Sequence, residues 1–185
     1  MPNQSSISPP AAQHGFVLVV ALILLLVLTL LGLAAAQSTS LEERMSGNAR
    51  NQDMALQAAE AGLRAGESCL NAGLSVCSNF GGDTGGTYLF DQSAPPTTPL
   101  WKTVDWSDAA SVLSYSTVTA SDIPSVATQP QIIIEQMPPV AAPGGNLGAQ
   151  QFGGGAPTIQ LYRITALGTG GDSTSTVMLQ SMYGP

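Results

Sequence analysis

The sequence predicts an α+β fold in which one long N-terminal helix packs on an antiparallel β-sheet. Three observations predict it: an uncharged apolar run near the N-terminus, a proline-free continuation of that run, and two alternating segments near the C-terminus. The chain has 185 residues, enough for one domain with an appendage. A helical region followed by a run of strands is typical of the α+β class.

The first element is an apolar helix over residues 16–36. This stretch reads FVLVVALILLLVLTLLGLAAA, 21 residues without a charged side chain. At about 1.5 Å per residue, the helix is about 32 Å long, which matches the hydrocarbon core of a bilayer. A domain of this size cannot surround such a helix on every side. We therefore predict that residues 16–36 lie in a membrane.

The residues before the apolar run do not form an ordinary secretory signal. Residues 1–15 contain no Lys or Arg, and the run is longer than the ~7–15 apolar residues of such a signal. However, Ala34-Ala35-Ala36 matches an A-x-A cleavage site. Release after Ala36 as a soluble secreted protein is therefore an open alternative.

The helix is expected to continue as an amphipathic half over residues 37–70. There is no proline from Ser38 to Glu67. Apolar residues at spacings of whole helical turns predict a stripe on one face. Its members are Leu41, Met45, Leu56, Ala59, Leu63 and Leu70. We expect the second half of this stripe to pack on the protein's own sheet. The apolar and amphipathic halves together predict one helix of about 50 residues.

The remaining residues, 71–185, carry the signals of a globular head. Segments 158–167 (TIQLYRITAL) and 174–183 (TSTVMLQSMY) alternate in polarity around a glycine-rich turn, which predicts a β-hairpin at about 158–183. Segment 131–137 (QIIIEQM) lies between two prolines and predicts a strand that joins the hairpin in a meander.

Three further segments have weaker patterns. Residues 112–118 (VLSYSTV) alternate loosely and predict a strand. Residues 91–100 are a Pro/Thr loop, and the stretch between Pro138 and Pro157 is expected to hold no regular structure.

Composition excludes several functions. Five Lys+Arg against 12 Asp+Glu give a net charge of −7, and a protein that binds a phosphate backbone needs a basic surface. We therefore expect no directly bound nucleic acid. The single histidine is His14, so the body of the protein cannot build a histidine-dependent triad or a multi-histidine metal site.

No catalytic residue, cofactor site or metal site is predicted. The glycine-rich runs at 81–86 and 168–172 lack the lysine of a phosphate-binding loop and predict turns. One carboxylate in each run is too few for calcium. Asp105 and Asp108 flank Trp106, which indicates a helix cap or turn.

Cys69 and Cys77 are the two cysteines of the chain and close a nine-residue loop where the long helix is expected to end. Outside the cytoplasm we expect a disulfide, which contributes roughly 2–3 kcal/mol by loop entropy. Two reduced thiols are the alternative.

The N-terminal residues resemble the type IV prepilins and pseudopilins. A short polar leader ends in Gly15, and Phe16 opens the apolar helix. The run STSLEERMSGNARNQDMALQAAEAGLRAGE, at 38–67, is similar to the N-terminal region of the PilX family of minor pilins. The C-terminal YRITALGTGG…VMLQSMYG is similar to that family's closing hairpin. The resemblance implies a pilin-like fold.

The resemblance also implies how the N-terminus is processed. Prepilin peptidase would remove residues 1–15 by cutting between Gly15 and Phe16, and Phe16 would be N-methylated. Two positions depart from the prepilin pattern. Gln13-His14 replaces the usual basic residue before the glycine, and Val20 replaces the usual glutamate at mature position five. That glutamate is understood to pair with the N-terminal amine of a neighbouring subunit. Val20 therefore suits a subunit that has no other subunit above it in the pilus.

A minor pilin of this kind would be a single-pass protein of the bacterial inner membrane with a periplasmic head. It would prime pilus assembly, near the tip, through helix contacts with other minor pilins and the major pilin, and could meet a tip adhesin. A pseudopilin of type II secretion is the nearest alternative. A membrane-anchored enzyme is the least favoured, because the mature chain would contain no histidine.

Overall fold

The computed structural model describes residues 14–81, 85–91, 98–142 and 157–185. The chain divides into two compact units, residues 1–47 and 48–185. The first element is helix α1, His14–Asn71, whose 58 residues contribute to both units. The predicted helix is confirmed and is somewhat longer than expected.

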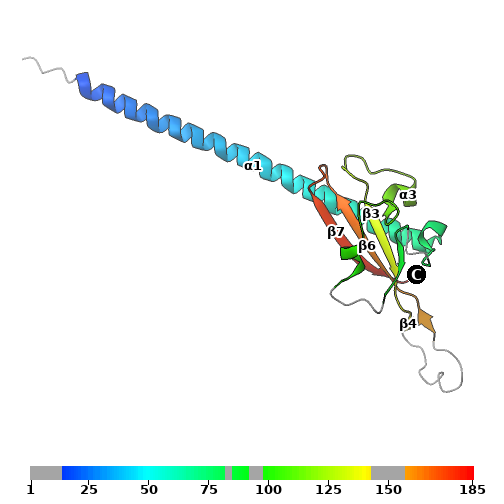
Figure 1. Cartoon of the computed structure of the whole chain (residues 1–185). Coiled ribbons are helices and arrows are strands. Elements are labelled where there is room, and N and C mark those ends of the chain that lie inside the picture. Colours follow the sequence, from blue (N-terminus) through cyan, green and yellow to red (C-terminus); the bar gives the residue numbers. More distant parts are fainter. Residues whose placement is uncertain (1–13, 82–84, 92–97, 143–156) are drawn as a thin grey trace, which may run out of the picture. The chain divides into compact units, whose positions relative to one another are not determined.

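The second unit contains a five-stranded sheet beside the last turns of α1 (Figure 1). Its strands are β1 (Thr87–Leu89), β2 (Leu113–Ser114), β3 (Gln131–Gln136), β6 (Tyr162–Thr169) and β7 (Thr176–Tyr183). The order is β1-β3-β6-β7, with β2 also paired to β3. The β3-β6-β7 part is an antiparallel meander, whereas β1 runs parallel to β3.

The predicted hairpin and its meander partner are confirmed, with shifted strand boundaries. β6 begins at Tyr162, and Gly168 and Thr169 belong to it rather than to the turn. The residues at the start of the predicted strand form β5 (Thr158–Ile159), which pairs with β4 (Val140–Ala141). The expectation of no regular structure between Pro138 and Pro157 is therefore wrong at β4, because a short strand there pairs across the chain. Residues 143–156 lie outside the described residues.

The prediction of a strand over 112–118 is wrong for most of its length. Only Leu113 and Ser114 pair, as β2, and helix α3 (Tyr115–Thr119) follows at once. The buried side chain of Leu113 packs in the core, and one turn of helix then places Val118 against the same core. In the predicted loop at 91–100, residues 92–97 lie outside the description and Leu100 begins helix α2 (Leu100–Thr103).

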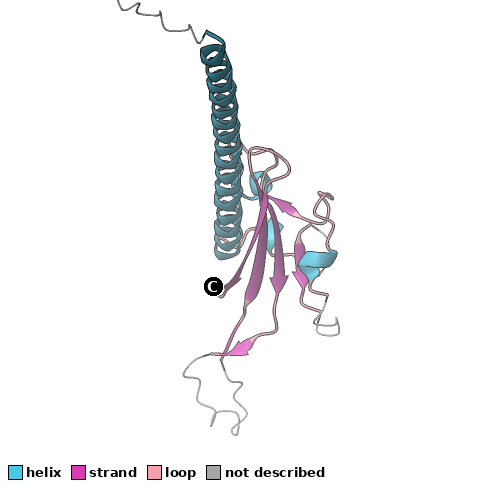
Figure 2. Cartoon of the chain, turned by 90° about the vertical axis from the view of Figure 1, so that its left-hand side faces the viewer, coloured by secondary structure: helices cyan, strands magenta, loops and turns pink. Residues whose placement is uncertain are grey.

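The sheet has apolar side chains on both faces. One face packs against α1 and includes Ile132, Ile134 and Ile164, all fully buried. The other face centres on Ile133 and is covered by α2 and its neighbours, including Trp101. Figure 2 shows the strands side by side with the last turns of α1 along them. The 3₁₀ helix η1 (Ser75–Cys77) follows α1.

Candidate functional site

The candidate functional element is α1, because its two parts have different surfaces. From Phe16 to Leu33 its large apolar side chains are exposed in the isolated chain. By length and composition the helix is long and apolar enough to cross a membrane. Apolar surface of this extent must be covered by lipid or by other helices.

The residues that the sequence singled out for processing and assembly lie at the start of this element. Gly15 and Phe16 belong to the first turn of α1, and Phe16 is 71% exposed. Val20 follows one turn later and is also exposed. Residues 1–13 of the predicted leader lie outside the described residues. Cleavage and methylation at Phe16 therefore stay predictions.

The buried positions in the second part of α1 are all small residues. They are Ala55, Ala58, Ala59, Gly62, Ala65, Gly66 and Cys69. In its second half the predicted stripe is confirmed at Ala59, which is completely buried, and at Leu63 and Leu70, which pack against the core, but it is wrong at Leu56, which is 38% exposed. Small residues are needed here since the helix lies very close to the strands.

The closest approach is at Gly168 in β6. A methyl group at this position would overlap the carbonyl oxygen of Ala55 and the amide nitrogen of Ala59. At Gly66 of α1, a methyl group would lie 2.9 Å from Cγ2 of Ile164. Helix and sheet backbones can approach this closely only where glycine removes the side chain at the point of contact. These glycines therefore set how the helix is held on the head.

Polar contacts fasten the helix to the β6–β7 hairpin at two points. The Asn51 side chain donates a hydrogen bond to the Asp172 carboxylate in the hairpin turn, at 2.8 Å. The hydroxyl of Ser181 in β7 donates a hydrogen bond, at 3.1 Å, to the carboxylate of Glu67, which lies further along α1. The side-chain and backbone hydrogen bonds from Thr174 hold the pKa of Asp172 below its usual value of 3.8. The turn is thus an ordered anchor for the helix.

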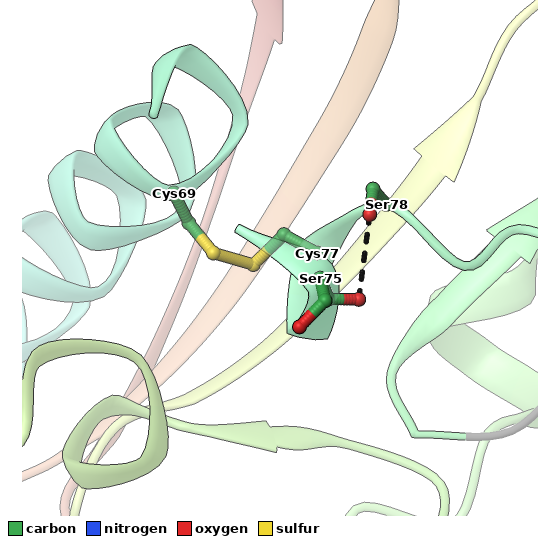
Figure 3. The surroundings of a disulfide bond; sticks show 4 residues. All are labelled: Cys69, Ser75, Cys77 and Ser78. Carbon is green, nitrogen blue, oxygen red and sulfur yellow. Dashed lines mark hydrogen bonds between the residues drawn. A yellow bond between two sulfur atoms is a disulfide. The ribbon is translucent and has the colours of Figure 1, made fainter. Parts of the chain in front are cut away.

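A disulfide links the end of α1 to η1 (Figure 3). Cys69 and Cys77 are both buried, and their Cα atoms are 6.0 Å apart. The pairing predicted for an oxidising compartment is therefore present, and it fixes the chain direction directly after the helix. Nearby, the Ser78 hydroxyl donates to the carbonyl oxygen of Ser75 at 3.4 Å.

Asp105 and Asp108, which the sequence places in a helix cap or turn, make only local hydrogen bonds among the described residues. Asp105 accepts hydrogen bonds from the backbone and hydroxyl of Ser107, whose hydroxyl contact does most to lower the pKa of Asp105. Asp108 accepts from the backbone of Ala110 and the hydroxyl of Ser111. The two aspartates therefore close turns, as predicted. In the part of the chain that the structure describes, no three His, Cys, Asp or Glu residues gather as metal ligands.

Sequence reasoning missed two structural features of the head. It gave Gly62 and Gly66 no part in packing, and it assigned Gly168 to a turn, although these three glycines lie at the contact between helix and sheet. Their spacing with alanines at Ala55, Ala58, Ala59 and Ala65 was the available signal. It also missed the ion pair between Glu135 and Arg163, because the two residues are 28 positions apart.

Comparisons with known proteins agree with this arrangement. A family model described as PilX N-terminal matches residues 14–64. A second, described as type IV pilus assembly protein PilX C-term, matches residues 44–185. No curated protein and no solved structure matches the chain.

Proposed function

Because the chain belongs to the PilX family of type IV pilus assembly proteins, we propose that it is a minor pilin that primes assembly of the pilus. The observation that carries the proposal is the division of α1 into an exposed apolar part and a part fastened to a folded head. Lipid covers the apolar part before assembly, and the helices of other pilins cover it afterwards.

The proposed route begins in the bacterial inner membrane, with the head in the periplasm. Prepilin peptidase cuts between Gly15 and Phe16, and Phe16 is then N-methylated. The role is structural rather than enzymatic. The family resemblance and the exposed position of Phe16 at the start of α1 support this route.

Val20 supports a place near the pilus tip. A carboxylate in the apolar core of a membrane or helix bundle, without a partner, costs on the order of 2.5–3.5 kcal/mol. A subunit with no neighbour above it gains nothing from that charge. The chain would therefore join other minor pilins, stand above the major pilin, and present its head toward a tip adhesin.

The first test is the intact mass and N-terminal residue of the protein purified from membranes of its native host. Methyl-Phe16 as the first residue would support the proposal. Gln37 as the first residue would contradict it and identify a soluble secreted protein released after Ala36. An intact Met1 would also contradict it and identify a plain single-span anchor.

The second test separates pilus assembly from type II secretion. Deletion of the gene should abolish or reduce surface pili and leave protein secretion unchanged, and re-expression of the wild-type chain should restore the pili. Loss of secretion with normal pili would contradict the proposal and favour a pseudopilin.

A further inference from the structure

β7 is the outermost strand on its side of the sheet (Figure 1). Among the described residues, its backbone groups hydrogen-bond only to β6, in an unbroken register from Tyr162–Tyr183 to Thr169–Thr176. An edge strand leaves every second N–H and C=O group without a strand partner. The backbone N–H and C=O groups on the free side of β7 can pair with the backbone of another extended chain.

This edge lacks the features that normally prevent pairing with other chains. Natural edge strands carry charged residues, prolines or bulges, or are very short. β7 has eight residues, TVMLQSMY, with no charged residue and no proline. It also pairs with β6 without a bulge. An open edge of this length is either an aggregation hazard or a docking site.

The side chains on one face of β7 suit an apolar partner. Met178 is 37% exposed and Met182 is 55% exposed, and they share this exposed face with Thr176 and Gln180. A shallow pocket of about 300 Å³ lies beside Met178. It is lined by Trp101, Thr165, Met178, Leu179 and Gln180. Methionine-rich surfaces adapt readily to apolar side chains of a bound segment.

The charges near this edge determine which strand fits. Glu67 contacts Ser181 of β7, and Asp172 lies in the turn that leads into the strand. Of the two cations in residues 72–185, Arg163 is bound to Glu135, and Lys102 lies over the ring of Trp101, 5.1 Å from its centroid. β7 itself carries no charge, and a carboxylate lies near each of its ends. A second copy of the chain would bring the same two carboxylates, so like charges disfavour self-pairing.

We propose that β7 is a docking edge for an extended segment of another protein, which adds a strand to the sheet. The segment has an uncharged centre, apolar side chains at alternate positions, and lysine or arginine at its ends. Backbone hydrogen bonds hold the segment, and the surface of Met178 and Met182 receives its apolar side chains. The inference concerns the head and does not depend on N-terminal processing or on priming.

The test uses the full chain in detergent and two synthetic peptides. Both peptides alternate Thr and Val, and one has lysines at its ends whereas the other has glutamates. Hydrogen exchange should show new protection of β7 amides with the lysine peptide. We expect its affinity to exceed that of the glutamate peptide by about tenfold or more.

Variants on the exposed face should separate edge pairing from adsorption. The double substitution Met178→Lys with Met182→Lys should lower the affinity for the lysine peptide by about tenfold or more, because the new lysines repel the peptide and the apolar contact is lost. Val140→Lys, at an exposed residue of β4, is the matched control and should bind like the wild type. Far-UV circular dichroism would check that each variant is folded.

Three results would overturn the proposal. The first is an absence of β7 protection at about 1 mM lysine peptide. The second is equal protection by both peptides, or equal binding to the wild type and the double variant. The third is concentration-dependent protection of β7 without peptide, which would make a second copy the occupant.

Discussion

The guanidinium of Arg163 in β6 donates two hydrogen bonds to the carboxylate of Glu135 in β3. Nε donates to Oε2 at 2.7 Å and Nη2 donates to Oε1 at 2.6 Å. The two residues are direct partners in the strand register, and the Glu135 side chain is only 3% exposed. The ring of Phe90 lies 5.4 Å from the guanidinium carbon. The pair thus ties the centre of the sheet to the segment after β1.

Loss of Arg163 should be strongly destabilising because it leaves the buried carboxylate of Glu135 without its partner. We expect Arg163→Met to lower the free energy of unfolding by about 3–5 kcal/mol, measured by denaturant titration of the full chain in detergent. Arg64→Met removes the exposed i,i+4 pair with Glu60 and should cost no more than about 0.5 kcal/mol. Equal effects of the two substitutions would refute this account.

A methyl group at Gly168 should separate α1 from the sheet. We expect Gly168→Ala to destabilise the head by about 1–3 kcal/mol or more, because it overlaps backbone atoms of Ala55 and Ala59 that cannot rotate away. Gly81→Ala is the control, since open space surrounds that position, and should change stability by less than about 0.5 kcal/mol. Thermal unfolding of the head measures both, and a neutral Gly168→Ala would contradict the close approach.

Removal of the disulfide should lower the stability of the head without changing its fold. We expect Cys69→Ser with Cys77→Ser to cost roughly 2–3 kcal/mol, from the loop entropy of the unfolded chain. Reducing agent should destabilise the wild type by a similar amount and leave the double variant unaffected. A reductant effect on the double variant would show that the loss arises elsewhere.

The anchor at Asp172 should make stability depend on pH under acidic conditions. The pKa of Asp172 is lowered below 3.8 by the hydrogen bonds from Thr174, so the folded state favours the carboxylate. Its contribution is fully present above the unfolded value and is lost as pH falls through the folded pKa. We expect Asp172→Asn to remove this part of the acid dependence, and Thr174→Val to weaken it. Unfolding curves from pH 6 down to about pH 2 measure it, and parallel curves for all three proteins would argue against it.

Val20 should matter for where the subunit stands in the pilus. We expect Val20→Glu to reduce the number of pili per cell and to alter the pilins that copurify, because it introduces an unpaired carboxylate into an apolar environment. Val20→Leu keeps the apolar character and should behave as wild type. Electron microscopy and mass spectrometry of purified complexes are the measurements. Unchanged pili and partners in Val20→Glu would remove the argument for a tip position.

The amino-acid sequence by itself determined the elements whose patterns are local. The uncharged run at 16–36 and its proline-free continuation predict one long helix, which is α1. Alternation over 158–167 and 174–183 predicts the β6–β7 hairpin. Each pattern depends on side chains that are close along the chain, so periodicity alone identifies it. The short loop between Cys69 and Cys77 made their disulfide predictable for the same reason.

Only the tertiary structure decided which surfaces meet. The backbone of Gly168 lies in contact with the helix, so Ala55 and Gly66 of α1, which the predicted stripe did not include, are buried, whereas Leu56 is exposed. The tertiary structure also turned residues 115–119 into a helix, since the core accepts Val118 from that direction. Hydrophobic periodicity records which residues avoid water, but it does not record how closely two backbones approach.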